Sequence, residues 1–141
     1  MLLQFILQCQ GDYAILRSME EEKRYHIAKI AHALSDPIRL EILDILVKGR
    51  DASCVSTPHP QLPQAVCPYL DVLPNLGKDI SASKLSYHLK ELRDAGLVEE
   101  HRLGKQVFYL VNQKTLEHLL EAVKAYYLPL SAFSAPEGFL S

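Results

Sequence analysis

Neither sign of charge dominates this 141-residue sequence, which has 15 lysines and arginines against 17 aspartates and glutamates. The overall charge therefore does not mark the protein as a polyanion binder, and any nucleic-acid contact must come from a local patch. No apolar run approaches the roughly 18–20 residues that span a bilayer. The opening stretch MLLQFILQCQG lacks a basic region and a small-residue cleavage site, so we expect no signal peptide.

Motifs for catalysis are also missing. The sequence has no triad-like spacing of nucleophile and base, no glycine-rich phosphate loop and no paired-carboxylate motif. The three cysteines, an odd number, favour a reducing environment over a disulfide framework. We therefore expect a cytoplasmic protein that is not an enzyme.

The length and the 48% content of hydrophobic residues predict a single globular domain with its own core. Residues 1–19 have no clear period, and we interpret them as a poorly ordered N-terminal extension. The sequence leaves open whether Met1 or Met19 is the true start. The domain is expected over residues 20–128, followed by a loose C-terminal tail over residues 129–141.

Two helices are expected at the start of the domain. Apolar residues at helical spacing predict the first, over residues 20–34. The second begins with Asp36, a favourable N-cap, and Pro37, whose missing N–H costs nothing at the first helical position. Gly49 is expected to close this helix.

Residues 50–79 form an insertion-like segment that contains five of the eight prolines. The first part of the segment is expected to be a loop. A short helix is predicted around residues 68–76, and Pro74 must end or distort it because proline has no backbone N–H to donate. A loop of this length inside a compact domain is either functional or mobile.

A third helix and a hairpin follow this segment. Ser81 caps the helix, which ends at Gly96, and Gly104 marks the turn of the β-hairpin. A last helix is expected over residues 116–128. The fold class is therefore α+β, mostly α-helical with one small β-hairpin, and the order of its elements is that of a winged helix-turn-helix.

The third helix is predicted to have one apolar and one polar face. Leu85, Leu89 and Leu92 share the apolar face. The opposite face carries Ser83, Lys84, Tyr87, Lys90 and Glu91. The N-terminal residues of a recognition helix reach base edges in the major groove, and this face fits that role. An ordinary amphipathic surface helix is the alternative.

Two blocks, LSDPIRLEILDIL and KLSYHLKELRDAGLVEEHRLGKQVFYLV, resemble the signature blocks of the ArsR/SmtB family of bacterial winged-helix repressors, and the resemblance covers residues 22–128. It implies a homodimer, formed through residues 22–34 and 116–128, that binds double-stranded operator DNA and is released by an inducer, often a metal or metalloid ion. It also implies DNA contacts from recognition helix and wing, by Ser81, Ser83, Lys84, Tyr87, His88, Arg102, Lys105 and Gln106.

Three alternatives stay open. His88 lies at the border of the apolar face, where a hydrogen-bonded position inside the domain competes with a DNA contact. Arg39 can form an intramolecular ion pair or touch a phosphate. The chain as a whole can be a winged-helix module that binds another protein without binding DNA, or a repressor that responds to a signal other than a metal.

The metal sites that the resemblance implies are missing from this chain. A Cys-x-Cys pair is expected before the recognition helix, where only Cys67 occurs. The ligand positions of the last helix carry Gln113, Thr115, Tyr126 and Pro129, and Pro129 has no side-chain donor atom.

The insertion-like segment offers a different set of ligands. Cys54, His59 and Cys67 can bind a soft metal or metalloid ion, the one cofactor that the sequence suggests. The two thiols can alternatively form a regulatory disulfide. Two incidental cysteines in a loop are the competing interpretation, and the sequence does not identify the inducer or the operator.

Overall fold

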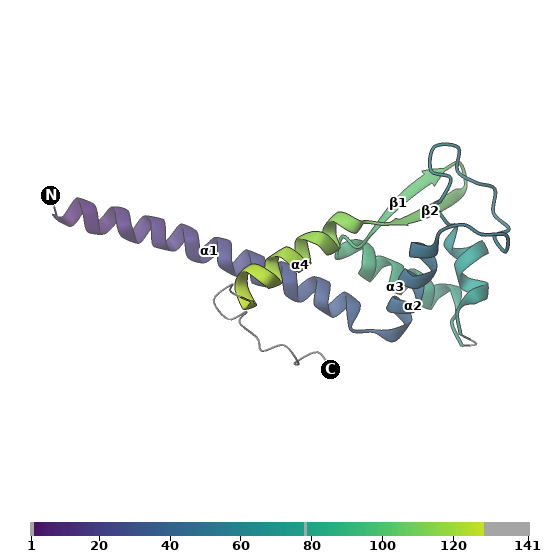
Figure 1. Ribbon diagram of the computed structural model, residues 1–141, viewed down its shortest axis with the longest axis horizontal. Helices are drawn as coiled ribbons and strands as arrows, with labels where there is room; N and C mark the ends of the chain where they lie inside the picture. Colours follow the sequence, from purple (N-terminus) through teal and green to yellow (C-terminus); the bar gives the residue numbers. More distant parts are fainter. Residues whose placement is uncertain (1, 78, 129–141) are drawn as a thin grey trace, which may run out of the picture.

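The computed structural model describes residues 2–77 and 79–128, with side chains described from residue 17 onward (Figure 1). Within these residues the elements are α1 (Leu2–Leu34), α2 (Pro37–Lys48), η1 (Pro68–Val72), η2 (Leu73–Asn75), α3 (Ala82–Asp94), β1 (Val98–Leu103), β2 (Gln106–Val111) and α4 (Gln113–Tyr127). The mostly helical α+β class with one antiparallel hairpin is confirmed. None of the described helices is long and apolar enough to cross a membrane.

Helix α1 is longer than predicted. It begins at Leu2 rather than near Glu20, so the expected irregular extension over residues 1–19 is part of this helix from Leu2 onward. The N-terminal part of α1 extends away from the other elements, whereas its C-terminal part lies beside α4 (Figure 1). The predicted tail lies outside the described residues.

The predicted boundaries of α2 and α3 are confirmed by their caps. The Asp36 carboxylate accepts a hydrogen bond from the backbone N–H of Ile38 at 2.8 Å. The Ser81 hydroxyl caps α3 in the same way. Gly49 and Gly96, after the two helices, have φ of 70° and 75°, a left-handed conformation that side chains with a Cβ disfavour.

One core holds α3 in place. Helices α1, α2 and α3 meet the hairpin around side chains with almost no accessible surface: Ile30, Ile42, Leu85, Leu89, Leu92 and Leu97. Each such side chain contributes roughly 1.5–3 kcal/mol of transfer free energy on burial. The orientation of α3 relative to α2 and β1 is therefore fixed by its leucines.

The insertion-like segment is anchored on the hairpin. Val66 and Tyr109 of β2 exchange two backbone hydrogen bonds, at 2.9 and 3.2 Å. Beside this bridge, Ala65, Cys67 and Phe108 form a second, smaller apolar cluster. The short helix predicted around residues 68–76 is present as a π-helical turn, η1, followed by a 3-10 turn, η2, that contains Pro74.

Candidate nucleic-acid interface

The exposed face of α3 presents polar residues at its N-terminal half. Ser83, Lys84 and Tyr87 are exposed, and Tyr87 keeps 55% of its surface accessible. The leucines of the opposite face are buried in the core, so α3 cannot rotate without exposing them. The side chains predicted to enter the major groove are therefore held on one fixed surface.

Two other predicted DNA-contacting residues also have local structural roles. The Ser81 hydroxyl accepts a hydrogen bond from the Lys84 N–H at 3.2 Å, while the residue stays exposed at the start of α3. Gln106 is half-buried in β2 and pairs with Leu103 across the hairpin. These positions lie beside the start of the recognition helix and beside the wing turn, and their contacts with DNA stay predictions.

His88 is not available to DNA, which corrects its inclusion in the predicted interface. Its side chain is only 8% exposed, and its Nδ1 lies 3.9 Å from the Asp36 carboxylate at the start of α2. The residue follows Leu85 by three positions, which brings it to the buried side of α3. Within the described residues its buried Nδ1 has no hydrogen-bond partner. His88 therefore contributes to the α2–α3 contact rather than to the groove.

Arg39 has a role that neither sequence interpretation anticipated. Its Nε donates to the Ala33 carbonyl at 2.7 Å, and its Nη2 donates to the His32 carbonyl at 3.1 Å. Both carbonyls belong to the last turn of α1, where such groups lack helical partners and attract cations. The buried guanidinium of Arg39 thus caps α1 and joins it to α2.

The hairpin carries a polar cluster centred on Glu100. This carboxylate accepts hydrogen bonds from Arg93 of α3, from Arg102 Nε at 3.0 Å and from the Tyr109 hydroxyl at 2.6 Å. Arg102 remains largely exposed, and Lys105 is exposed in the turn. The cluster joins the recognition helix to the hairpin.

This cluster explains how an acidic residue is tolerated near the proposed DNA face. The hydrogen bond from Tyr109, together with those from Arg102 and Arg93, lowers the pKa of Glu100 although partial burial opposes the change. Burial, followed by the bond to Glu100, raises the pKa of Tyr109 well above its ordinary value, so this hydroxyl stays protonated as a donor. Two arginines surround one carboxylate, which leaves the cluster with a net positive charge.

Sequence reasoning missed one contact beside α3. The hydroxyl of Tyr69, in η1, lies 2.5 Å from Ser86 Oγ on the recognition helix. Tyr69 keeps 42% of its surface exposed, and Leu70 beside it keeps 43%. An isolated tyrosine in a proline-rich segment gave no signal that it would meet the recognition helix.

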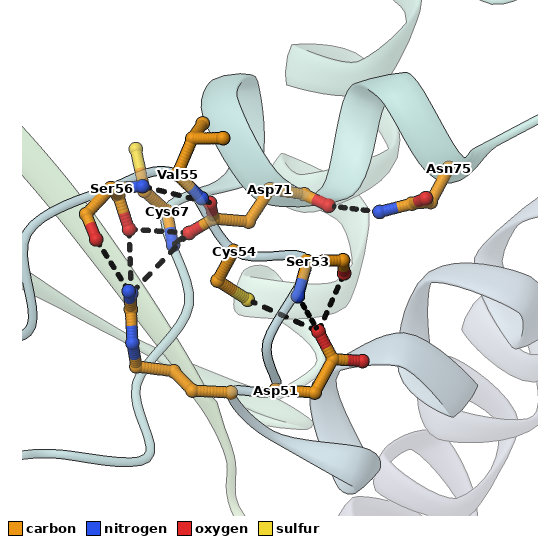
Figure 2. A network of polar contacts seen from close by, with 9 residues as sticks. Asp51, Ser53, Cys54, Val55, Ser56, Cys67, Asp71 and Asn75 are labelled. Atoms are coloured by element: carbon orange, nitrogen blue, oxygen red, sulfur yellow. Dashed lines mark hydrogen bonds and ion pairs between the residues drawn. The ribbon is translucent and has the colours of Figure 1, made fainter.

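The insertion-like segment is organised by the buried carboxylate of Asp71 (Figure 2). Its Oδ1 accepts hydrogen bonds from the backbone N–H groups of Val55 and Ser56, at 2.9 and 3.1 Å. Its Oδ2 accepts from the Ser56 hydroxyl and from the Cys67 N–H at 3.1 Å, and forms an ion pair with Arg50 at 3.5 Å. The one signal in the sequence is the position of Asp71 inside the apolar run PYLDVL.

The bonds to Asp71 outweigh the cost of burying its charge. Burial alone would raise the pKa of this carboxyl, but the hydrogen bonds from Ser56, Cys67 and Val55 together lower it. Asp71 therefore stays ionised inside the protein. Its hydrogen bonds and its ion pair connect Arg50, Val55 and Ser56 to Cys67.

The predicted ligands Cys54, His59 and Cys67 do not form a ready ligand set. No group of three or more histidine, cysteine or acidic side chains that could hold a metal ion occurs among residues 17–77 and 79–128. His59 Nδ1 accepts hydrogen bonds from the N–H groups of residues 61 and 62, and its ring packs edge-on against Phe108. Figure 2 shows the sulfur atoms of Cys54 and Cys67 on different sides of the Asp71 network.

Comparison with known proteins identifies the family of this chain. A family model described as "Bacterial regulatory protein, arsR family" matches residues 79–100, which include all of α3 and the start of β1. The arsenical resistance operon repressor of Staphylococcus xylosus is 31% identical over 93 residues, which are 66% of this chain and 72% of that protein. This chain belongs to the ArsR family. The transcriptional repressor SdpR of Bacillus subtilis (strain 168) is 31% identical over 85 residues, or 60% and 74% of the two chains.

Solved structures agree on the fold of this ArsR-family chain. A homodimeric winged helix-turn-helix DNA-binding domain from Mycobacterium bovis matches with a TM-score of 0.53 and 21% identity, covering 75% of this chain and 83% of that one. An ArsR-like transcriptional regulator from Rhodococcus sp. RHA1 matches with a TM-score of 0.50 and 24% identity, covering 72% and 79%. As an ArsR-family member, the chain is a DNA-binding transcriptional regulator and not an enzyme.

Proposed function

We propose that this ArsR-family chain is a homodimeric repressor that reads its operator with α3. The observation that carries the proposal is the fixed, exposed row of Ser83, Lys84 and Tyr87 on a helix whose leucines are locked into the core. A major groove admits one α-helix, and hydrogen-bonding side chains near its N-terminus reach the base edges. The hairpin β1–β2 is the wing, and Arg102 and Lys105 at its end meet the DNA backbone.

The dimer is proposed to form through α1 and α4. Apolar and aromatic side chains on these two helices remain exposed in the single chain, with Tyr25 at 71%, Leu120 at 60% and Tyr127 at 59%. A groove of about 1060 Å³ lies between α1, the C-terminal end of α3 and α4. Large apolar side chains left exposed on neighbouring helices favour association with another chain. The M. bovis domain that shares this fold is homodimeric, which supports a dimer for this chain as well.

The test of groove reading uses Lys84→Ala and Tyr87→Ala. Each variant should lose roughly 1–3 kcal/mol of affinity for a duplex selected from a random library, because each loses a base contact. Fluorescence anisotropy measures the affinity, and Lys114→Ala, at an exposed position of α4, is the control. Unchanged affinity in both variants would exclude α3 as the reading element. A wild-type protein without salt-dependent binding to any duplex would favour the protein-interaction alternative.

We also propose that the inducer acts through the thiols of Cys54 and Cys67. Cys54 is partly exposed, and the chain beside both residues is tied to Asp71, so a reaction at either thiol disturbs one shared network. A hundredfold loss of operator affinity requires about 2.7 kcal/mol of coupling. Arsenite, Zn²⁺, Cu(I) and peroxide are the agents to assay for DNA release. Equal release of the wild type and a Cys54→Ser, Cys67→Ser variant would exclude the thiols.

A further inference from the structure

Tyr69 lies in η1, an element that packs against β2, and its side chain contacts the recognition helix. Its hydroxyl is bonded to Ser86 of α3, and it lies close enough to Tyr109 of β2 to add to the raised pKa of that residue, after the larger effects of burial and Glu100. Ser86 precedes Arg93 by seven residues, or two helical turns, so both lie on the same side of α3. Arg93 in turn reaches Glu100 on the hairpin. Tyr69 is therefore on the wing side of α3.

The chemistry of the Tyr69–Ser86 pair leaves one donor available. Either hydroxyl can be the donor across the 2.5 Å contact. When Ser86 donates to the phenolic oxygen, the Tyr69 O–H is directed elsewhere, and the residue is exposed enough for it to meet a partner from solvent. An exposed phenolic O–H is a donor suited to an anionic acceptor.

We propose that Tyr69 is a further DNA contact, in which its hydroxyl, positioned by Ser86, donates a hydrogen bond to a phosphate oxygen. The inference rests on the proposed DNA-binding function and extends the interface from α3 and the wing to η1. In helix-turn-helix proteins the element before the recognition helix crosses the DNA backbone, and tyrosine is among the side chains that bond phosphate oxygens.

A phosphate fits this position better than a base does. The groove-reading row of Ser83 and Tyr87 lies on the central exposed arc of α3, whereas Ser86 lies at its edge. Tyr69, which comes from η1, contacts α3 at this edge. Its side chain therefore lies beside the helix and does not project from the exposed face of α3. Residues at the flank of a helix inserted in the groove face the phosphates that border the groove.

The experiment compares Tyr69→Phe with the wild type on two duplexes, one selected from a random library and one of scrambled sequence. Tyr69→Phe should lose about three- to tenfold in affinity on both duplexes, as expected for one lost hydrogen bond. The dependence of affinity on salt should stay unchanged, because a neutral hydroxyl neutralises no phosphate charge. Ser86→Ala should show part of the same loss, and the double variant should lose less than the sum of the two single variants.

Ser35→Ala, which removes an exposed hydroxyl from the turn between α1 and α2, is the control and should bind as the wild type does. Thermal unfolding of Tyr69→Phe should match the wild type, which separates a contact from a folding defect. Unchanged affinity on both duplexes overturns the proposal. A loss confined to the selected duplex overturns it too, since that result indicates a base contact. A wild type that binds neither duplex refutes the proposed function itself.

Discussion

Asp71 shows how one buried side chain shapes a long segment of this protein. Its carboxylate accepts hydrogen bonds from Val55 and Ser56, which precede it by 16 and 15 positions in the sequence. It also forms an ion pair with Arg50, which precedes it by 21 positions. Arg39 acts similarly at the junction of α1 and α2, where its guanidinium binds two helix-terminal carbonyls. In both cases a buried charge is stabilised by several directed bonds, the condition under which burial of a charge is tolerated.

Asp71→Asn is expected to destabilise the protein by roughly 2–4 kcal/mol. The amide nitrogen of asparagine is a donor, and it would face the Cys67 N–H and the Arg50 guanidinium, which are donors as well. Urea unfolding measures the difference. Asp44→Asn, at an exposed position of α2, is the control and should change stability by less than about 0.5 kcal/mol. Wild-type stability in Asp71→Asn would show that the network does not hold the segment.

The same carboxyl predicts a dependence of stability on pH. Because the folded protein lowers the pKa of Asp71, its contribution is fully present above the unfolded value of about 3.9 and is lost as the pH falls through the folded pKa. Unfolding free energies measured between pH 6 and pH 3 should therefore fall more steeply in the wild type than in Asp71→Asn. Parallel curves for the two proteins would contradict this assignment.

Among the elements, the hairpin and α3 behave as one unit because Glu100 links them. The Glu100 carboxylate forms ion pairs with Arg93 of α3 and with Arg102 of its own strand. These ion pairs restrict movement of the wing relative to α3. Lys105 in the turn differs from Arg102, since it forms no ion pair within the described residues. The two basic residues of the wing are therefore held to different degrees before DNA arrives.

Arg102→Ala and Lys105→Ala should each weaken DNA binding, and each variant should lose a similar factor of affinity on every duplex, whatever its sequence. Each should reduce the slope of log affinity against log salt by about one phosphate contact. Arg102→Ala should lose more affinity, because it also removes a cation that offsets Glu100. Salt titrations followed by anisotropy check both expectations, and Lys124→Ala on α4 is the control. Slopes identical to that of the wild type would exclude backbone contact by the wing.

For the whole molecule, we propose that the exposed side chains of α1 and α4 form the dimer interface. Leu120 suits a mutational test of this interface, because 60% of its surface is exposed in the single chain. Val123, on the next turn of α4, is partly buried, and a charge there would also disturb the fold. A charge at position 120 therefore spares the fold of each subunit.

Leu120→Glu is expected to give folded monomers, since it would bury a carboxylate in the proposed interface. Multi-angle light scattering should report one chain instead of two, and affinity for the selected duplex should fall by at least about a hundredfold when one of two half-sites is lost. Gln113→Glu, at an exposed position near the start of α4, should stay dimeric. A dimer in Leu120→Glu would place the interface elsewhere.

Local signals in the sequence predicted most of the fold. The caps at Asp36 and Ser81 and the leucine spacing of α3 act over a few residues, so a sequence pattern contains them. The burial of His88 depends on how α3 packs against α2, and the Tyr69–Ser86 contact joins residues 17 positions apart. Such contacts follow from tertiary packing, and no local pattern specifies them.

The length of α1 has a practical consequence for measurements in solution. A helix of 33 residues is about 50 Å long, and its N-terminal part extends away from the other elements in Figure 1. A particle of this shape has more hydrodynamic drag than a sphere of equal mass. Its elution volume in gel filtration, calibrated with compact standards, would overstate its mass, and a monomer would be mistaken for a dimer. Only methods that report mass independently of shape can count its subunits.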